Sequence, residues 1–535
     1  MKMLSKFEFL SFFLMVGSIL SFMFSSMFIS QNLIYFYEIE LFNMNSVAFT
    51  YIIYLDWMSV MFSSIVLMIS SLILVYSKVY MGKECHQFLW LTVLFIFFMI
   101  IMIFSPSSLG VLLGWDGLGM ISYCLVIYYK SASSYNSGFI TAATNRLGDS
   151  MLMLSVAWFS LSGLFIFFES SMIIFFILAC MTKSAQVPFN SWLPLAMAAP
   201  TPISSLVHSS TLVTAGVYLL IRFYFCYSGT FLITILLISS FLTIFIAGVS
   251  ALQEFDMKRV VALSTLGQLG FMILILCVGY PYIAFFHLLV HALFKALLFM
   301  CAGSIIHSSM GLQDLRKMGS LNLDLLVKSC VNISLLNLMG LPFSSGFYSK
   351  DALIELTYFN FGGVGLGVLL LILISMTIAY SMRLIIYFSL GSWILFMESS
   401  LKMTFSIIIL SLLNIFLGVY MNWMIQELYL ICISIMVKLM PLFIIMMGVC
   451  WHATLKLMKP VTWFVMGMLF MTNLTKMTSY LIMLSLMILK VVDQGWFESF
   501  IYNLKISTSK ASYYLYKHSF SYISIGSMLL IISFL

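Results

Sequence analysis

The chain contains a long series of apolar runs, such as Leu89–Phe104 and Met403–Val419. A helix needs about 20 mainly apolar residues to cross the hydrocarbon core, whereas a strand of a membrane barrel needs only about ten residues of alternating polarity. Because the hydrocarbon contains no water, backbone groups there must bond within their own segment, which continuous apolar runs do as helices. The pattern predicts an all-α polytopic membrane protein and excludes a barrel.

Composition supports the same fold class. Of the residues, 63% are hydrophobic and 8% are charged, whereas a soluble domain has about half apolar and about a quarter charged residues. A soluble protein is therefore excluded. The run lengths predict about 15 membrane-spanning helices. They cover residues 8–29, 50–76, 88–104, 107–129, 138–163, 171–187, 203–225, 231–252, 259–279, 282–306, 326–349, 363–388, 403–422, 428–450 and 512–535.

The basic residues of the loops gather on one side of the membrane. When crossings are counted from the N-terminus, its side receives Lys2, Lys6, Lys78, Lys83, Lys130, Lys258, Arg259, Arg316, Lys317, Lys402, Lys456 and Lys459. The other side receives Glu38, Glu40, Glu169, Asp351, Glu355 and Glu427, with Arg222 and Lys350 as its basic residues. Because Lys and Arg favour the inner side, the N-terminus is predicted on the matrix or cytoplasmic side.

The segment 460–490 is apolar enough to cross the membrane. If it did, Lys490, Lys505, Lys510 and Lys517 would move to the acidic side and break the charge pattern. We therefore predict that 461–505 forms a helix that lies along the surface or along neighbouring helices before a final span at 512–535.

No pattern in the chain predicts a cofactor or metal. The nine cysteines are scattered without a CxxC pair, which argues against iron–sulfur clusters, zinc and a disulfide framework. Gly363, Gly365 and Gly367 open an apolar span without a preceding strand, so they indicate helix packing and not dinucleotide binding. The net charge of +7 follows from topology and does not indicate nucleic acid.

Two spans are interrupted by QVPFNSWLP and GLPFSSGFYSKD. Proline removes a hydrogen-bond donor and clashes with the preceding turn. Broken helices in matching positions are typical of transporters built from repeats. Lys183 lies before the first break and Lys350 at the end of the second. The alternative is ordinary proline kinks beside lysines that reach toward the surface.

The first group of intramembrane charges is Asp116 in GWDGLG, Asp149 in NRLGDS and Lys183. An ionisable group in hydrocarbon is by default a functional hypothesis. Asp149 has Arg146 three residues earlier on its helical face, so a local ion pair is an alternative to a relay role. Asp116 has no basic residue within one turn, and Lys183 is its candidate partner. Burial disfavours the charged lysine and a carboxylate favours it, which would let the carboxylate switch proton binding.

The second group lies in FHLLVHALFKALL. The spacing of four places His287, His291 and Lys295 on one helical face. Histidine titrates near neutral pH, so the row predicts a proton path. A metal site fits poorly because no carboxylate or cysteine joins them. His208 in SLVHSST is a further candidate, with an ordinary buried polar residue as the alternative.

Lys350 and Asp351 are adjacent at the predicted end of the second broken helix. The alternative to a functional role is a solvated pair of charges at a helix end. Adjacent residues do not face one another on a helix, so Asp351 is expected to act on a different neighbour.

The stretches LLGWDGLGMISYCLV, TKSAQVPFNSWLPLAMAAPTPISSLVHSS, DMKRVVALSTLGQLG, HLLVHALFKALLFMCAGSIIH and GLPFSSGFYSKD resemble the chain 5 family of mitochondrial NADH:ubiquinone oxidoreductase (respiratory complex I). That family is related to large subunits of Mrp-type cation/proton antiporters. The resemblance is strong over residues 50–390. It implies a core membrane-arm subunit that moves protons across the mitochondrial inner membrane, driven by electron transfer from NADH to ubiquinone elsewhere.

The resemblance also implies two inverted five-helix repeats, each with a broken helix. The expected parts are N-terminal helices at 1–87, repeats at 88–225 and 231–388, further helices at 403–450, a lateral helix at 461–505 and a final span at 512–535. The proton-transfer residues of the family fall on Asp116, Asp149, Lys183, His208, His291, Lys295 and Lys350, with Asp351 beside the last. Many relatives carry Glu where this chain has Asp116.

The resemblance implies that NAD, FMN, iron–sulfur clusters and ubiquinone belong to other subunits. The expected partners are antiporter-like membrane-arm subunits along the lateral helix, and membrane lipids. Two alternatives stay open: an Mrp-type sodium/proton antiporter subunit, and a purely structural subunit whose buried charges hold helices together.

Overall fold

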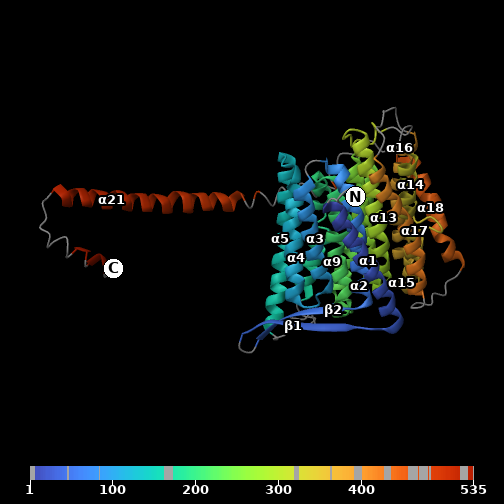
Figure 1. Cartoon of the computed structure of the whole chain (residues 1–535), viewed down its shortest axis with the longest axis horizontal. Helices are drawn as coiled ribbons and strands as arrows, with labels where there is room; N and C mark the ends of the chain where they lie inside the picture. The colour runs from blue at the N-terminus through green and yellow to red at the C-terminus, as the bar shows by residue number, and fades with distance from the viewer. Residues whose placement is uncertain are drawn as a thin grey trace. The chain divides into compact units, whose positions relative to one another are not determined.

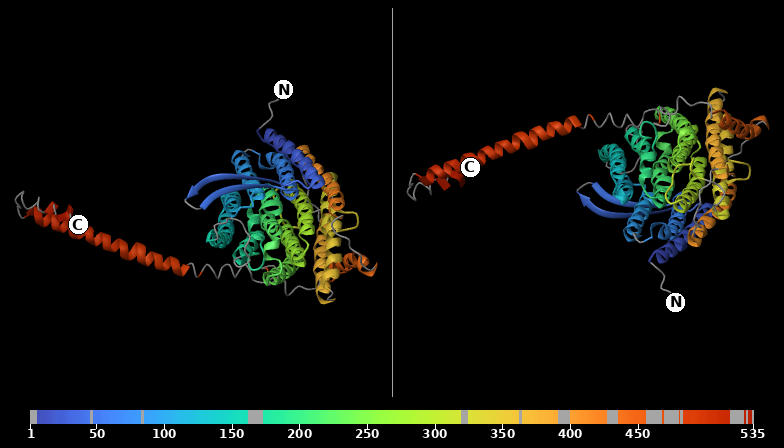
Figure 2. Two further views of the ribbon diagram at one scale, coloured as in Figure 1. Left: turned by 90° about the horizontal axis from the view of Figure 1, so that it is seen from below. Right: turned by 90° about the horizontal axis from the view of Figure 1, so that it is seen from above.

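The computed structural model describes most of the chain, and Figures 1 and 2 show its ribbon. The described residues are 6–44, 47–82, 85–161, 173–318, 324–361, 364–390, 400–426, 435–455, 468, 480, 483–517, 528–529 and 531–533. The chain divides into two compact units, Met1–Met471 and Thr472–Leu535.

The first unit is a bundle of helices. Its longer helices are α1 (Lys6–Gln31), α2 (Trp57–Met81), α3 (Cys85–Phe104), α4 (Ser108–Val126), α5 (Ala132–Leu161), α6 (Ile173–Lys183), α9 (Leu212–Arg222), α11 (Leu232–Gln253), α12 (Met257–Val278), α13 (Pro281–Ser308), α14 (Leu325–Met339), α15 (Ser345–Phe361), α16 (Val364–Leu390), α17 (Leu401–Gln426) and α18 (Ile435–Leu455). Its short helical segments are η2 (Ile127–Tyr129), α7 (Trp192–Leu195), η3 (Ala196–Ala198), α8 (Thr201–Ile203), η4 (Ser204–Thr211) and α10 (Tyr224–Tyr227).

Ten helical segments of the described chain are long and apolar enough to cross a membrane. Shorter apolar helices cover Ile173–Lys183, Leu325–Met339 and Lys438–Cys450. Two of these shorter helices, Ile173–Lys183 and Leu325–Met339, lie directly before the breaks in the two interrupted spans. Each interrupted span was predicted as a single crossing. The predicted class of helical membrane protein is confirmed.

A β-hairpin replaces the predicted start of the second span. β1 (Tyr35–Met44) pairs antiparallel with β2 (Val47–Leu55), and the hairpin lies across one end of the bundle (Figures 1 and 2). The prediction of a helix from residue 50 is therefore wrong, and α2 begins at Trp57. Asp56 Oδ1 accepts from the Ser59 amide at 2.9 Å, and Ser59 Oγ accepts from the Asp56 amide at 3.0 Å. This reciprocal cap starts the helix at that residue.

The second break also differs from its prediction. α14 ends at Met339, because Gly340 has a φ of 79° and ends the helix in the left-handed region. α15 begins at Ser345 and runs to Phe361. The predicted span 326–349 is therefore wrong at its end. Lys350 and Asp351 lie inside α15, not at the end of the broken helix.

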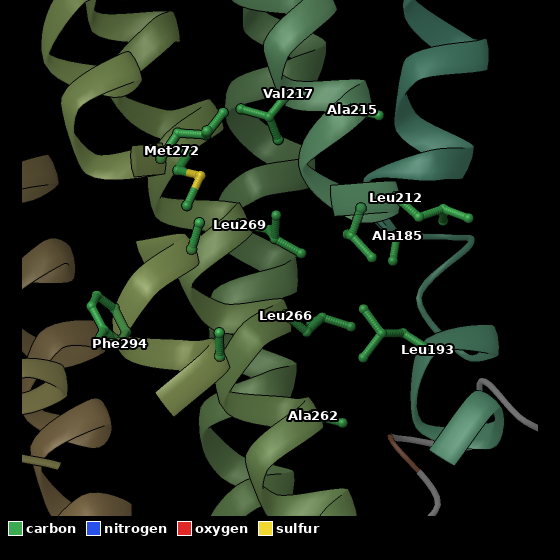
Figure 3. Packing of buried hydrophobic residues seen from close by; sticks show 14 of the residues in the cluster. Ala185, Leu193, Leu212, Ala215, Val217, Ala262, Leu266, Leu269, Met272 and Phe294 are labelled. Carbon is green, nitrogen blue, oxygen red and sulfur yellow. The ribbon is translucent and has the colours of Figure 1, made fainter. Parts of the chain in front are cut away.

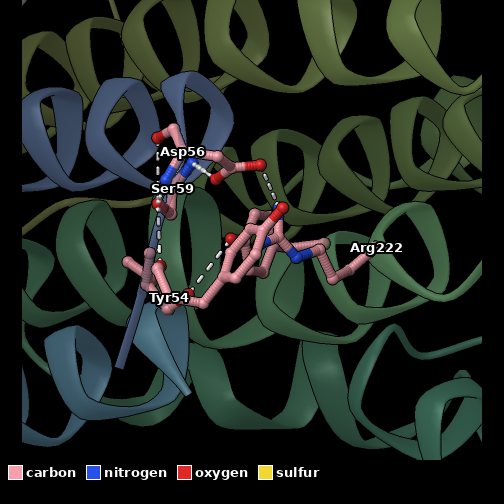
Figure 4. Close-up of polar contacts among 6 residues, drawn as sticks. Tyr54, Asp56, Ser59 and Arg222 are labelled. Atoms are coloured by element: carbon pink, nitrogen blue, oxygen red, sulfur yellow. Dashed lines mark hydrogen bonds and ion pairs between the residues drawn. The ribbon is translucent and has the colours of Figure 1, made fainter. Parts of the chain in front are cut away.

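Ion pairs join elements at the two ends of the bundle. Glu8 of α1 contacts Lys78 of α2 at 3.0 Å and Lys402 of α17 at 2.9 Å. At the hairpin end, Arg222 of α9 contacts Asp56 at 2.5 Å (Figure 4). Lys78 and Lys402 share one end and Arg222 lies at the other, as the crossing count predicted for these three residues.

The core consists of the helices that carry the polar motifs. The segments Thr201–Arg222, Met257–Val278 and Pro281–Ser308 are buried throughout their apolar stretch, whereas α1 is largely exposed. Side chains from α7, α9 and α12, such as Leu193, Leu212 and Leu266, fill the space between these segments (Figure 3). Ionisable groups within these stretches, such as His208, His287 and Lys295, are therefore surrounded by protein, whereas Arg259 at the start of α12 is exposed.

The longest described helical stretch of the second unit covers residues 483–517. A π-helical segment, η5 (Lys490–Phe497), leads directly into α21 (Glu498–Lys517). The predicted boundary between a lateral helix ending at 505 and a span starting at 512 falls inside α21. The predicted lateral segment does end in a helix, but this helix continues past residue 505 into the predicted final span. Most of 461–482 and of 518–535 lies outside the described residues.

Candidate functional site

The first cluster comprises Lys183, Trp115 and Asp149, from α6, α4 and α5. Lys183 is fully buried, and its Nζ donates to the Trp115 carbonyl oxygen at 3.1 Å. The same Nζ lies 4.6 Å from the centre of the Trp115 ring. The indole Nε1 of Trp115 donates to Asp149 Oδ1 at 2.8 Å. Trp115 therefore links the buried ammonium to the carboxylate of another helix.

Arg146 extends this cluster outward. Its guanidinium lies 3.3 Å from Asp149 Oδ2 and 3.9 Å from Asp116 Oδ1. Its own side chain is 52% exposed and that of Asp116 is 40% exposed. The expectation that Asp116 pairs with Lys183 is not met, because the ion-pair partner of Asp116 in the described chain is Arg146. The local Arg146–Asp149 pair expected as an alternative is present.

Side-chain hydrogen bonds replace the missing helical hydrogen bond at the first break. In a continuous helix the Ser184 carbonyl would accept from residue 188, which is proline and has no N–H. Gln186 Nε2 donates to this carbonyl at 3.2 Å, and Gln186 Oε1 accepts from Thr243 Oγ1 of α11 at 2.9 Å. The non-helical segment that follows Lys183 is thus bonded to its neighbour.

His208 lies in the π-helical segment η4 and is buried. Its ring packs edge-on against Trp192 of α7, with centroids 6.2 Å apart. Neither ring nitrogen has a hydrogen-bond partner among the described residues. π-Helical turns are frequent at functional sites because they displace a side chain from the regular ladder.

The second cluster lies between α12, α13 and α15. Lys295 Nζ donates to Ser264 Oγ. His287 binds Gln268 Oε1 through Nε2 at 3.2 Å and Ser349 Oγ through Nδ1 at 2.8 Å. The rings of His287 and His291 are 6.4 Å apart between centroids. The predicted row on one face of α13 is therefore assembled.

Lys350 belongs to the same cluster and closes the second break. Its Nζ donates to the carbonyl oxygen of Leu338, near the end of α14. In a continuous helix that oxygen would accept from residue 342, which is Pro342 and has no N–H. The broken helix thus presents a free carbonyl to a buried lysine.

Asp351 faces a different neighbour from Lys350, as expected for adjacent residues. Its Oδ1 is buried without a hydrogen-bond partner in the described structure. Glu355 follows one turn later on α15, and Lys438 of α18 interacts electrostatically with both carboxylates. The alternative of a solvated pair with Lys350 is wrong, because Lys350 is 6% exposed.

Several residues that build the clusters were missed from the sequence. Trp115 binds both Lys183 and Asp149, and Gln268, Ser264 and Ser349 each bind one predicted ionisable group. The signal that could have found two of them is the spacing of four between Ser264 and Gln268, which matches the spacing on α13. Within the described chain, no group of three or more His, Cys, Asp or Glu side chains is arranged to hold a metal.

Three family models match the chain. Residues 105–375 match the model described as NADH:quinone oxidoreductase/Mrp antiporter, TM. Residues 41–89 match NADH-Ubiquinone oxidoreductase (complex I), chain 5 N-terminus, and residues 380–535 match NADH dehydrogenase subunit 5 C-terminus.

Curated relatives carry the name NADH-ubiquinone oxidoreductase chain 5. The chain is 43% identical to that of Anopheles gambiae over 525 residues, covering 91% of this chain and 90% of the relative. It is 46% identical to that of Locusta migratoria over 435 residues, covering 76% and 75%. The relative from Mytilus edulis is 38% identical over 496 residues, covering 87% of each chain.

Solved structures share the fold. A chain of the Mrp complex from Dietzia sp. DQ12-45-1b superposes with a TM-score of 0.74 at 23% identity, covering 94% of this chain and 60% of that one. A chain of the membrane-bound sulfane sulfur reductase, an archaeal respiratory membrane complex, has a TM-score of 0.65 at 19% identity, covering 83% and 93%.

A helical bundle with two broken helices and a buried lysine at each break defines an antiporter-like membrane subunit. The chain belongs to the family of NADH-ubiquinone oxidoreductase chain 5. It is a proton-translocating membrane-arm subunit of the H⁺-translocating NADH:quinone oxidoreductase, complex I, and its partners are other subunits of that complex. Its relatives are mitochondrial membrane subunits.

Proposed function

We propose that the first and second clusters, with His208 between them in the sequence, carry the protons that this subunit moves. The roles fall on Asp116, Asp149, Lys183, His208, His287, His291, Lys295, Lys350 and Asp351. The helices that bear most of these groups are buried in protein, where an ionisable side chain is costly and marks function.

One observation carries this proposal: both lysines at the breaks bind neutral oxygens. Lys183 donates to the Trp115 carbonyl and Lys350 to the Leu338 carbonyl. A carboxylate partner would hold a buried lysine in its charged form, whereas a carbonyl oxygen leaves it free to lose its proton when neighbouring charges change. Each lysine is thus suited to bind and release a proton in a cycle.

The arrangement in the membrane is part of the proposal. The N-terminus lies on the matrix side of the inner membrane, because the basic loops share its side. The chain has about 15 spans, with inverted repeats at 88–225 and 231–388. Antiporter-like subunits lie along the lateral helix, and the redox groups reside in other subunits.

The test compares lysine variants in the assembled complex. Lys183→Met and Lys350→Met keep the length and apolar body of the side chain and remove the charge. Lys402→Met, whose side chain is 61% exposed and pairs with Glu8, is the control. Native gels stained for NADH dehydrogenase activity measure assembly, and proteoliposomes measure protons moved per assembled complex.

We expect both cluster variants to assemble and to lose proton transfer. A purely structural role predicts the reverse: less assembled complex and unchanged pumping per complex. If the chain migrates instead in a small band without NADH oxidation and supports sodium flux, the sodium/proton antiporter alternative replaces the proposal.

A further inference from the structure

His287 is the histidine of the second cluster that is bonded at both ring nitrogens. Ser349 of α15 binds Nδ1 at 2.8 Å, and Gln268 of α12 binds Nε2 at 3.2 Å. His291 lies one turn along α13 and is equally buried, yet neither of its nitrogens has a partner in the described structure. The two histidines are therefore in different environments despite their shared face.

The partner at Nε2 assigns the proton at that atom. Gln268 presents its carbonyl oxygen Oε1, which can only accept a hydrogen bond. Nε2 of His287 therefore carries a hydrogen whether the ring is neutral or charged. Nδ1 is the nitrogen that gains or loses the proton.

The partner at Nδ1 can serve both protonation states. A serine hydroxyl both donates and accepts. Ser349 Oγ also lies 3.3 Å from the carbonyl oxygen of Gly346, one turn earlier on α15. When Nδ1 is bare, the Ser349 O–H donates to it. When Nδ1 is protonated, it donates to Ser349 Oγ and the hydroxyl hydrogen turns to Gly346.

Lys350 links the protonation of His287 Nδ1 to the second break. It follows Ser349 on α15, and its charge acts on His287 and, with Lys295 and His287, on His291. Two positive charges repel strongly in a dry interior, so His287 and Lys350 favour sharing one excess proton. A proton that leaves Lys350 Nζ leaves a neutral amine, and its arrival at Nδ1 makes the imidazolium.

We propose that Ser349 and Gln268 are positioning residues that keep His287 hydrogen-bonded in both protonation states, so that it takes and returns the proton exchanged with Lys350. This inference rests on the proposed function and adds to it the assignment of His287, rather than His291, as the histidine that exchanges with Lys350.

The experiment uses the full complex in proteoliposomes, with pumping measured per assembled complex. Ser349→Ala removes the hydroxyl, and Ser349→Thr restores it. Gln268→Leu removes the acceptor at similar volume. Ser334→Ala is the matched control, because Ser334 is a buried serine of α14 whose Oγ binds the carbonyl of Val331 in its own helix at 2.7 Å.

We expect Ser349→Ala and Gln268→Leu to slow coupled proton transfer about tenfold, which corresponds to the loss of one hydrogen bond at the reacting group. Ser349→Thr should recover most of the rate, and Ser334→Ala should match the unmodified complex. NADH oxidation with an artificial electron acceptor should stay constant in all variants.

The inference is overturned if Ser349→Ala lowers only the amount of complex, or if Ser349→Thr is as slow as Ser349→Ala. Lys350→Met in the same preparation separates the two levels of the argument. If it abolishes pumping while Ser349→Ala and Gln268→Leu do not slow it, the proposed function stands and this inference fails. If it pumps normally, the proposed function itself fails.

Discussion

Lys350 donates a hydrogen bond to the carbonyl oxygen of Leu338 across the break between α14 and α15. That oxygen is available because Pro342 cannot provide the amide that would bind it in a helix. The proline and the lysine therefore act together. Pro342 leaves the Leu338 carbonyl without a helical donor, and the titratable Lys350 binds that carbonyl instead. The clusters differ in this respect, since Lys183 binds a carbonyl of α4, which is not part of its own broken helix.

The first prediction concerns Pro342. Pro342→Ala supplies an amide that competes with Lys350 for the Leu338 carbonyl. We expect normal assembly and proton transfer slowed about tenfold, because the lysine loses its partner. Pro441→Ala, which replaces a proline inside α18, is the control. Equal pumping by the two variants in proteoliposomes would contradict the prediction.

The second prediction concerns Gly346. A Cβ at this position would lie 1.9 Å from the carbonyl oxygen of Asn337, and backbone atoms cannot move aside as a side chain can. Gly346→Ala should destabilise the fold by about 3 kcal/mol or more and reduce the assembled complex on native gels. Gly17→Ala in α1, where the nearest atom is 3.9 Å away, should assemble normally. Full assembly of Gly346→Ala would show that α14 and α15 need not approach so closely.

The third prediction concerns Trp115. Trp115→Phe keeps an aromatic face beside Lys183 and removes the N–H that binds Asp149. Because a buried carboxylate is left with one fewer donor, coupled proton transfer should slow about tenfold. Trp90→Phe on α3, where the side chain is 60% exposed, should have no effect. An unchanged pumping rate in Trp115→Phe would remove the indole from the path.

The fourth prediction concerns the ion pair between Asp56 and Arg222. Their side chains are 11% and 14% exposed, and the guanidinium stacks 4.4 Å from the Tyr54 ring (Figure 4). Breaking a buried pair from one side destabilises by about 3–5 kcal/mol, which partial exposure reduces here to about 2 kcal/mol. Arg222→Gln should therefore lower the temperature at which the NADH-staining band is lost.

The matching double variant tests the pairing itself. Arg222→Gln combined with Asp56→Asn leaves no unpaired charge, so it should be more stable than Arg222→Gln alone. The pair of Arg316 and Asp314, whose side chains are 59% and 22% exposed, provides the control, and Arg316→Gln should leave the transition temperature unchanged. Additive effects of Asp56→Asn and Arg222→Gln would contradict the coupling.

The helices and the ionisable residues were predictable, whereas the partners of those residues were not. The row of His287, His291 and Lys295 follows from a spacing of four, which depends on local geometry alone. Arg146 as the partner of Asp149 follows from the same rule. Arg146 as the partner of Asp116 does not, because it depends on how α4 packs against α5.

Helix ends also depend partly on local sequence and partly on contacts between distant segments. The cap formed by Asp56 and Ser59 is local, but the runs of residues on either side of it are equally apolar. Hydropathy therefore extended the second span into β2, since it cannot distinguish a strand paired in a hairpin from the first turns of a helix. The hydrogen bonds between β1 and β2 decided the outcome.

By itself, the amino-acid sequence determined that this chain is a helical membrane protein, because apolar length and proline placement act within each segment. It also predicted which ionisable groups lie within the apolar spans. Only the tertiary structure decided that Lys183 and Lys350 bind carbonyl oxygens and that His287, unlike His291, is bonded at both nitrogens. Those facts depend on which helices lie within about 3 Å of each atom, a distance set by packing between residues far apart in the chain.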